Sequence, residues 1–537
     1  MIRLLLWGML GITQAFAVFA DDPPSTPKSA ILAAGVAGAI SPAPPAEQKK
    51  EKSAPRVVST EAIDFRGLGK DRENLTPELI ASRSRRLEAT TDFYLLRFPQ
   101  AAGAPARILD ARIWQSIEAA AEQNDLDPMV LAGMIFIESF GDPFARSPTG
   151  PAGIAQLTKS SAKEMGLVVG KKIQTGTREV TKKRTVGRGS KKRTITETKT
   201  VKVYQTIDER YDADRAIMAM ARRINNRREW LGGKLDFAIA EYHMGAGRMT
   251  KLLSAYFGRK TKLRDIPEAM RGSSVSYAEL FWTNTPYFRP DVYKQIDQLN
   301  RVDFSPTYYF RVQQAMRLLQ LHRKSPAQYA ALASGYRGRP GQNMLANLQS
   351  SLAGDSQTEE LSLKRPKDID AEVGQRIVTL PAIASTRGVR AGKAVTSTLA
   401  AERSTIGCLL FVAEQLAILQ GTKYKGLETS SMIRPAESDS PKPDPTLPMH
   451  TVGWAFDLPR KPLSKDTVRD LNFILMDLRF AGLLTFGQEG KPKDFHVVRH
   501  PDYAAQFEKF YWDSVAVPQA ASGAPAVTLG DPSEQLR

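Results

Sequence analysis

Residues 127–140 read Asp-Pro-Met-Val-Leu-Ala-Gly-Met-Ile-Phe-Ile-Glu-Ser-Phe. Asp127 followed by Pro128 predicts a helix start, because aspartate caps a first turn and proline suits the first helical position. The run that follows is almost entirely apolar, so we expect a buried helix that ends at Glu138. A carboxyl among apolar side chains should have a raised pKa, which suits a general acid at neutral pH. A surface glutamate at a helix end is the alternative interpretation.

Two further motifs follow Glu138 in order. The first, Gly150-Pro-Ala-Gly-Ile-Ala-Gln156, is typical of a glycine-punctuated turn that enters a new helix. The second is Ala240-Glu-Tyr-His-Met-Gly245. With Glu138-Ser139, they resemble the soluble lytic transglycosylase family, which reads Glu-Ser, then Gly-x-x-Gly-x-x-Gln, then Ala-x-Tyr-Asn-x-Gly. The resemblance covers residues 110–300 and implies a goose-type lysozyme-like fold.

The resemblance also implies a reaction, the cleavage of peptidoglycan between N-acetylmuramic acid and N-acetylglucosamine. A glycosidase usually needs two carboxylates. Here the resemblance implies that Glu138 alone protonates the leaving oxygen and then takes a proton from the sugar's 6-hydroxyl, which closes a 1,6-anhydro ring. It implies no cofactor for this domain. Ser139, Gln156 and Tyr242 would bind or orient the sugar, and the alternatives for them are helix capping, a turn hydrogen bond and core packing.

Two positions near these motifs depart from the family's pattern. His243 stands where the family commonly has asparagine, which leaves the role of that position open. The stretch Pro286-Tyr-Phe-Arg-Pro290 falls where the family has an Asn-Tyr-Val segment that lines the cleft. Tyr287 is therefore a candidate for binding the glycan.

A strongly basic segment, residues 168–206, interrupts the domain. Between residues 170 and 203, 12 Lys and Arg residues stand against Glu179 and Glu197, a net charge of +10 within a chain of formal charge +18. Alternation of threonine, valine and charged residues predicts a long hairpin with Gly187 and Gly189 near its tip. The hairpin is either a solvated extension or an electrostatic arm for anionic cell-wall polymers.

A second group of chemically active residues lies near the carboxyl end of the chain. His450 and Asp457 stand seven residues apart around a glycine, and His496 follows in Asp-Phe-His-Val-Val. Two imidazoles and one carboxylate with a fourth position open are typical of a catalytic zinc site. With Ser-Met-Ile-Arg434 upstream, this order resembles the zinc D-Ala-D-Ala carboxypeptidase and dipeptidase family over residues 400–500, which implies a small α+β domain.

The second resemblance implies a residue that contacts the substrate, but this chain has no general base at the position where the family has one. Arg434 would steady the carbonyl or carboxylate of a peptide stem. The family has a glutamate three residues before its last histidine, and here that position is Lys493. Asp494 is one residue out of register and Glu489 lies further back. We therefore expect zinc or peptide-stem binding with weak or absent peptidase activity, and an active peptidase is the alternative.

The chain as a whole is expected to be a multidomain exported protein. Its start has a positive residue, an apolar stretch and small residues, which predict a secretory signal peptide. The lone cysteine, Cys408, excludes an intrachain disulfide and a cysteine-based metal site. The expected segments are a signal peptide (1–20), a Pro/Ala-rich linker (21–57), a lytic transglycosylase domain with the basic insertion (58–335), a linker (336–375), a zinc peptidase-like domain (376–515) and a disordered tail (516–537).

The fold class that follows is a mainly α, lysozyme-like domain with a β-hairpin insertion, plus a small α+β domain. We expect the protein in the periplasm or cell envelope, with peptidoglycan as partner and no stable transmembrane segment. A non-catalytic peptidoglycan-binding scaffold and a bifunctional glycan and peptide-stem hydrolase are the alternatives. The charge of +18 also suggests a protein that binds nucleic acid, but the signal peptide and the concentration of charge in one segment argue against this function.

Overall fold

The computed structural model describes residues 75–258, 262–336, 377–381, 384–385, 388–392, 399–433, 449–450, 453–489, 494–500 and 503–515. Several expected features lie outside these residues. They are the signal peptide, the first linker, nearly all of the second linker, the tail, Arg434 and Lys493.

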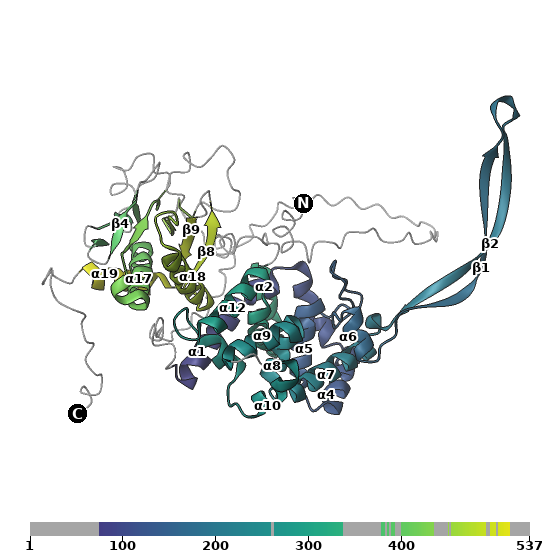
Figure 1. The fold of residues 1–537 in the computed structure, drawn as a ribbon, viewed down its shortest axis with the longest axis horizontal. Coiled ribbons are helices and arrows are strands. Elements are labelled where there is room, and N and C mark those ends of the chain that lie inside the picture. Colours follow the sequence, from purple (N-terminus) through teal and green to yellow (C-terminus); the bar gives the residue numbers. More distant parts are fainter. Residues whose placement is uncertain are drawn as a thin grey trace, which may run out of the picture.

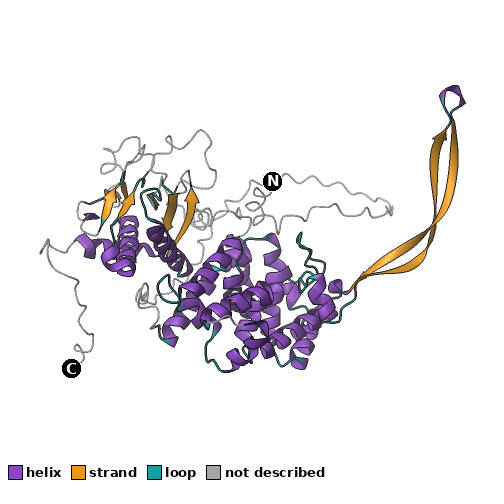
Figure 2. Ribbon diagram, in the orientation of Figure 1, coloured by secondary structure: helices purple, strands orange, loops and turns teal. Residues whose placement is uncertain are grey.

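The first domain is helical and carries one long hairpin (Figures 1 and 2). Its helices are α1 (Pro77–Thr90), α2 (Asp92–Leu96), α3 (Ala104–Ile108), α4 (Ala111–Gln123), α5 (Pro128–Ser139), α6 (Lys159–Glu164), α7 (Ala213–Trp230), α8 (Leu235–Met244), α9 (Ala246–Tyr256), α10 (Ile266–Arg271), α11 (Tyr277–Trp282), α12 (Pro290–Val302), α13 (Tyr308–Lys324) and α14 (Pro326–Tyr336). The helical content and the arrangement are consistent with a lysozyme-like fold.

Helix α5 lies in the core of this domain. It begins as the sequence predicts, because the Asp127 carboxylate accepts a hydrogen bond from the Met129 backbone N–H at 2.8 Å. The helix is buried from Met129 to Phe136 and packs along α13. It ends at Phe140, whose left-handed backbone (φ 54°) stops the helix directly after the Glu138-Ser139 pair. The burial of α5 and this abrupt end place Glu138 at the rim of the core.

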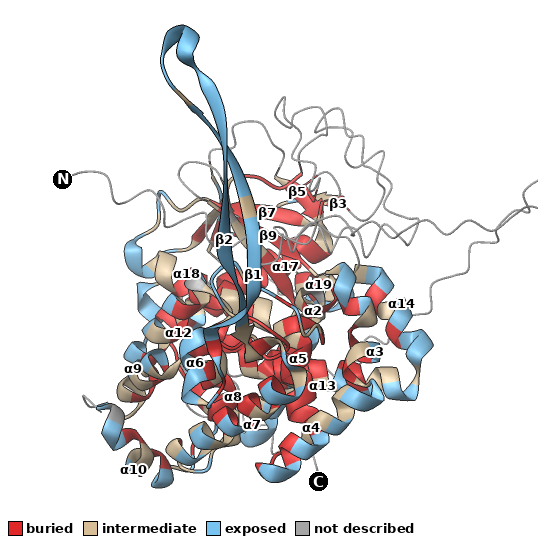
Figure 3. Ribbon diagram, turned by 90° about the vertical axis from the view of Figure 1, so that its right-hand side faces the viewer, coloured by how far each residue is buried: buried red, intermediate tan, exposed pale blue. Residues whose placement is uncertain are grey.

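The basic insertion forms an antiparallel hairpin of β1 (Val169–Val186) and β2 (Arg193–Asp208). It projects away from the helices, and its strands are exposed along almost their whole length (Figure 3). Its base returns to the domain, where the Val168 backbone N–H donates to a Glu209 carboxylate oxygen at 2.7 Å. The hairpin therefore gains little from burial, and its strand pairing rests on backbone hydrogen bonds and β-branched residues.

The second domain is of the α+β type. Its strands are β3 (Ile377–Thr379), β4 (Val389–Ala391), β5 (Ala400–Glu402), β6 (Leu427–Thr429), β7 (Ala455–Leu458), β8 (Leu484–Glu489) and β9 (Asp494–Arg499), and its described helices are α17 (Arg403–Gln420), α18 (Lys465–Phe480) and α19 (Ala504–Val515). The main sheet is antiparallel in the order β7-β9-β8. Smaller pairs join β3 to β5 and, in parallel, β4 to β6.

Helix α17 is the core helix of the second domain. The stretch Arg403–Lys423 is long and apolar enough to cross a membrane by length and composition, whereas the sequence predicted no stable transmembrane segment. However, 72% of its most apolar window is buried inside the protein. Gly407 lets α19 approach closely, since a Cβ there would lie 1.9 Å from the Phe507 carbonyl oxygen. Packing within the domain thus accounts for the apolar character of α17.

The two domains contact each other through α18. Phe480, at the end of α18, packs against Phe281 and Trp282 of the first domain. In the opposite direction, the ring of Tyr293 lies 5.4 Å from that of Phe473 and packs on the core of the second domain.

Three polar contacts also join the two domains. They are Arg83 with Asp477 at 3.2 Å, Tyr287 with Asp470 at 2.8 Å and Asn472 with Asp297 at 3.3 Å.

Candidate functional site

Glu138 lies in the last turn of α5 and faces the first residue of α13. The Tyr308 hydroxyl donates a hydrogen bond to Glu138 Oε1 at 2.6 Å. Burial raises the pKa of Glu138 to about 7, although the Tyr308 hydrogen bond and the Arg223 charge oppose the rise. The side chain stays partly exposed. A carboxyl group with this pKa can either give or take a proton near neutral pH.

Tyr308 is held in place by His243. The two rings stack with centroids 5.0 Å apart and an interplanar angle of 21°. On its other side, His243 Nδ1 shares a hydrogen bond with the Ser305 hydroxyl at 2.9 Å. Burial lowers the pKa of His243 to about 4, so the imidazole is neutral at pH 7. The departure from the family's asparagine thus places a flat, neutral ring behind the tyrosine that contacts Glu138.

The three polar residues predicted to bind sugar all hold one loop, residues 145–157. The Ser139 hydroxyl donates to the Ile154 carbonyl at 2.8 Å, and the Tyr242 hydroxyl donates to the Ala155 carbonyl at 2.7 Å. The Gln156 amide donates to the carbonyls of Gly153 and Ala145 at 2.9 and 3.1 Å. These contacts are the turn and packing roles that the sequence left as alternatives. A role for the same three residues in binding sugar stays a prediction.

Arg210 secures this loop from the base of the hairpin. Its guanidinium donates to the carbonyls of Gly150 and Leu157 at 2.9 and 3.1 Å and pairs with Asp208 at 2.7 Å. Gly153 has a positive φ of 78°, and a Cβ there would lie 1.7 Å from the Arg210 carbonyl oxygen. The second glycine of the motif is therefore required by both conformation and space.

A second carboxylate, Glu241, lies in the layer below the site. It is fully buried, and its oxygens face Arg223 at 3.5 Å and Arg227 at 3.6 Å. Arg223 also lies over the Tyr242 ring at 5.2 Å and is one of the charges that act on Glu138. Because Glu241 is enclosed and faces two arginines, it is not presented to a substrate as Glu138 is.

Comparison with known proteins matches this part of the chain to one family. Residues 115–182 carry a transglycosylase SLT domain. The matched stretch contains Glu138, Ser139 and Gln156 and ends within strand β1. Tyr242 and Tyr308 lie beyond it, so their place in the site comes from the structure.

Three relatives each match a tenth of the chain. The chain is 47% identical over 55 residues to "Membrane-bound lytic murein transglycosylase F" of Saccharophagus degradans, which covers 10% of this chain and 11% of that protein. It is 47% identical over 51 residues to a protein of the same name in Desulfosudis oleivorans, with the same coverage. It is 41% identical over 54 residues to "Transglycosylase" of Enterobacteria phage PRD1, over 10% of this chain and 20% of that protein. The chain thus spans a tenth to a fifth of the length of the curated relatives that it matches.

Tyr287 lies at the contact between the two domains. Its hydroxyl donates to Asp470 of α18 at 2.8 Å, and the Arg469 guanidinium lies 5.3 Å from its ring centroid. Its side chain is still 40% exposed. The structure therefore gives Tyr287 a partner in the second domain, and its role in binding glycan stays a prediction.

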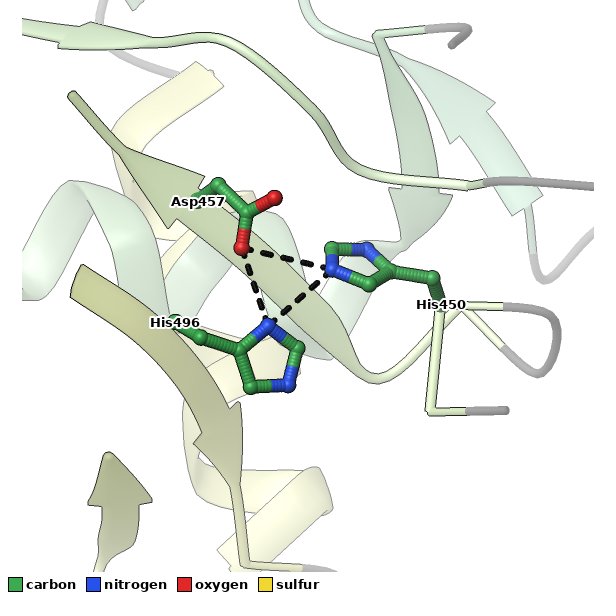
Figure 4. A group of neighbouring side chains, drawn as sticks. All are labelled: His450, Asp457 and His496. Carbon is green, nitrogen blue, oxygen red and sulfur yellow. Dashed lines mark hydrogen bonds and ion pairs between the residues drawn. The ribbon is translucent and has the colours of Figure 1, made fainter. Parts of the chain in front are cut away.

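Outside the SLT domain, His450, Asp457 and His496 converge in the second domain (Figure 4). Asp457 and His496 are direct cross-strand partners on β7 and β9. Asp457 Oδ1 lies 2.9 Å from His496 Nδ1 and 3.3 Å from His450 Nε2, and the two ring nitrogens are 3.1 Å apart. Their ligand atoms all lie within 4.8 Å of one another.

This donor set fits a zinc ion. Two imidazole nitrogens and one carboxylate oxygen are ligands that zinc accepts, and a fourth position is left for water or substrate. His450 Nδ1 contacts the Met432 carbonyl, which orients the ring so that Nε2 faces the other two ligands. Burial raises the pKa of Asp457, but the two histidines outweigh it and hold the pKa well below its usual range. The carboxylate is thus ready to bind a cation.

The two alternative candidates for a general base, Asp494 and Glu489, lie opposite each other on β9 and β8. Asp494 lies on the same strand as His496, but its carboxylate accepts a hydrogen bond from the Arg460 backbone N–H at 3.1 Å. Glu489 is the cross-strand partner of Asp494, at the far end of the β8–β9 pair. Lys493, at the position where the peptidase resemblance would place a glutamate, lies outside the described residues.

Proposed function

We propose that this protein is an exported peptidoglycan lytic transglycosylase that uses Glu138 as its single acid and base. The observation that carries the proposal is the Glu138 carboxyl at the end of buried helix α5, with a pKa raised to about 7 and a hydrogen bond from Tyr308. The SLT match and the lytic murein transglycosylase names of the relatives support the same substrate. The signal pattern of residues 1–20 supports the periplasm or cell envelope as its location.

In the proposed reaction, protonated Glu138 gives its proton to the glycosidic oxygen while the bond from that oxygen to the anomeric carbon breaks. The muramic acid N-acetyl group assists at the anomeric carbon. The Glu138 carboxylate then takes the proton of the sugar's 6-hydroxyl, whose oxygen bonds to the anomeric carbon and closes the 1,6-anhydro ring. The enzyme regains its proton and no water is consumed, so one carboxylate is enough. A pKa near 7 suits both halves of this cycle.

Tyr308 supports this cycle from one side of the carboxyl group. Its hydroxyl contacts Oε1, which leaves Oε2 for the substrate. A hydrogen bond to the ionised form stabilises it, so Tyr308 limits how far burial raises the pKa of Glu138. His243 keeps the tyrosine ring in position.

The deciding experiment is digestion of purified peptidoglycan with mass analysis of the sugar ends. Wild-type protein should release 1,6-anhydro ends, and Glu138→Gln should lower the rate by about 100- to 10,000-fold with the fold intact. Reducing ends that carry oxygen from labelled water would show a hydrolase instead. Wild-type turnover by Glu138→Gln would show that Glu138 is not the acid, and no cleavage by the wild type would leave the binding scaffold as the better proposal.

For the second domain we propose a zinc site formed by His450, Asp457 and His496, with peptide stems of peptidoglycan as the ligand class. A bound zinc ion would supply a Lewis acid for a peptide carbonyl. The convergence of the three ligand atoms supports the metal. The lysine at position 493 supports weak or absent peptidase activity, because lysine serves as a base only if its pKa falls far below about 10.4. Arg434 stays the predicted contact for a substrate carboxylate.

Metal analysis and calorimetry of the full chain test this site. We expect one zinc per chain, and a chelator should lower the melting temperature because the metal binds the folded state. His450→Ala should remove that sensitivity, whereas His500→Ala should keep it. A protein without zinc after reconstitution would contradict the site. Robust release of D-alanine would show that another residue, such as Asp494 or Glu489, acts as base.

A further inference from the structure

The hairpin of β1 and β2 takes part in neither proposed site except at its base. It extends far beyond the helical body, and both strands are solvent-exposed (Figures 1 and 3). Four large apolar residues on it are at least 36% exposed, together with Tyr204. The apolar residues are Ile173, Ile195, Val201 and Val203. A protein surface in water rarely places such residues beside each other without a partner.

The register of the hairpin separates its side chains into two unlike faces. Cross-strand partners share a face, and faces alternate along each strand. On one face, four of five successive partner pairs couple one cation with one β-branched apolar residue. Those pairs are Arg178 with Val201, Val180 with Lys199, Arg184 with Ile195 and Val186 with Arg193. We call these residues, with the fifth pair Lys182 and Glu197, the cationic-apolar face.

The opposite face over the same length is polar and carries little net charge. It consists of seven threonines with two lysines and one glutamate, in the pairs Thr177–Lys202, Glu179–Thr200, Thr181–Thr198, Lys183–Thr196 and Thr185–Thr194. Its net charge is +1, from Lys183 and Lys202 against Glu179, whereas the cationic-apolar face carries +4, from five cations against Glu197. Strand-forming propensity alone does not require this separation, because threonine and valine both favour strands.

The interleaving of the two side-chain types restricts the partner. A second copy of the hairpin would bring +10 against +10, which repulsion opposes. An anionic polysaccharide would satisfy the cations but would offer nothing to the valines and the isoleucine. An anionic lipid surface offers both, since phosphate headgroups lie directly above an apolar layer. Arginine and lysine suit that boundary because their long apolar stems let the charge reach the headgroups.

We propose that the cationic-apolar face of the hairpin binds an anionic lipid membrane surface. The cations pair with headgroup phosphates while Val180, Ile195 and Val201 enter the boundary with the acyl chains. Three further cations at the tip, Arg188, Lys191 and Lys192, extend the positive field toward the membrane. The threonine face stays toward water. This inference does not depend on the catalytic role of Glu138, and its lipid partner differs from the anionic wall polymer that the sequence predicts for the basic segment.

Co-sedimentation of the full chain with vesicles tests the proposal. The vesicles contain phosphatidylcholine with or without phosphatidylglycerol, and purified sacculi serve as the competing polyanion. Wild-type protein should partition to the anionic vesicles and not to the neutral ones. The combined change Arg178→Gln, Arg184→Gln and Arg193→Gln should weaken that partitioning by roughly 100-fold.

A second variant separates lipid from polymer. Val180→Thr, Ile195→Thr and Val201→Thr together keep every charge and every β-branch, and should weaken vesicle binding by at least about tenfold. Binding to sacculi should not change in this variant. The matched control is Thr181→Ser, Thr196→Ser and Thr198→Ser, which alters the opposite face and should bind vesicles as the wild type does. Thermal melting of all variants should be unchanged, because none of the substituted residues belongs to either core.

Three results would overturn the proposal. If the valine and isoleucine variant binds anionic vesicles as tightly as wild type, the apolar residues do not enter a membrane. If hairpin-dependent binding is found for sacculi and not for vesicles, the partner is an anionic wall polymer. Failure of wild type to bind either one would leave the hairpin as a solvated extension and would equally exclude the membrane.

Discussion

A carboxyl group with a pKa near 7 is half-protonated under physiological conditions, and the pKa of Glu138 reaches this value through effects that oppose each other. Burial at the end of α5 raises its pKa, whereas the Tyr308 hydroxyl and the Arg223 charge lower it. Because these effects oppose each other, the pKa of Glu138 should change when any one of these neighbours is changed. A change at Tyr308 should therefore alter the pH dependence of cleavage as well as its rate.

Tyr308→Phe should move the pH profile of cleavage to higher pH and should lower the maximal rate. Glu138 must be protonated to act as the acid, so cleavage should fall as the pH rises through about 7. Loss of the hydroxyl removes a contact that favours the ionised carboxylate, so the pKa of Glu138 should rise and the decline should move to higher pH. The maximal rate should fall by about tenfold or more, because the carboxyl loses its fixed orientation. Rates measured on peptidoglycan across pH 5 to about 9 test the shift.

Tyr309→Phe is the matched control for this experiment. Tyr309 neighbours Tyr308 in the sequence, but its ring packs against Tyr277 and Phe310 rather than toward the carboxyl. Its variant should keep the wild-type pH profile. A profile for Tyr308→Phe that matches wild type would show that the 2.6 Å contact does not set the pKa of Glu138.

At the scale of elements, the loop of residues 145–157 joins the catalytic helix to the base of the hairpin. Its carbonyls accept hydrogen bonds from Ser139, Tyr242 and Arg210. Arg210 lies directly after β2, so the loop is fixed by a residue that follows the whole insertion in sequence. The insertion can thus be long and exposed while its base remains part of the site.

Gly153→Ala tests this connection. A Cβ at this position would lie 1.7 Å from the Arg210 carbonyl oxygen, and the φ of 78° is unfavourable for alanine. We expect a loss of roughly 2–4 kcal/mol in the free energy of unfolding, measured by denaturant titration. Gly150→Ala is the control, since its φ of 111° is also strained but its Cβ would meet nothing within 4 Å. Equal losses in the two variants would mean that backbone strain, and not the contact with Arg210, determines the effect.

At the scale of the whole molecule, each domain contributes an aromatic ring to the core of the other. Phe480 of α18 packs on the first core and Tyr293 of α12 packs on the second. The Arg83–Asp477 ion pair beside them is largely buried, with 12% and 4% of the side chains exposed. A contact of this kind couples the stability of the two domains.

Phe480→Ala should uncouple them. Removal of the ring should cost roughly 1–3 kcal/mol of buried apolar contact between the domains. We expect calorimetry of the wild type to show one main transition and that of the variant to show two, with the zinc-dependent one separated from the rest. Phe510→Ala provides a control, because Phe510 packs on Phe411 inside the second domain. Two transitions already present in wild type would contradict coupling through α18.

Local sequence determined those features that depend on neighbouring residues. The Asp127-Pro128 start, the apolar run and the placement of Glu138 at its end could all be predicted, because helix caps and burial patterns are written within a few positions. The hairpin of the basic segment was predicted at residues 168–206, and the structure has its strands at 169–186 and 193–208. His450, Asp457 and His496 were predicted as metal ligands from their residue types and order, and the structure brings them together, but a metal at this place stays a prediction.

Tertiary structure alone decided which distant residues complete these local patterns. Tyr308 meets Glu138 across 170 positions of sequence, and no local signal distinguishes it from Tyr309. The sequence predicted a glycan contact for Tyr287, which stays a prediction, but it could not show that the Tyr287 hydroxyl reaches Asp470 across 183 positions. Ser139, Gln156 and Tyr242 were predicted to bind or orient the sugar, which stays a prediction, and only the structure shows that their polar atoms hold the loop. The physical reason is that contacts between distant side chains depend on how the helices pack. That packing cannot be inferred from the residues next to each position in the sequence.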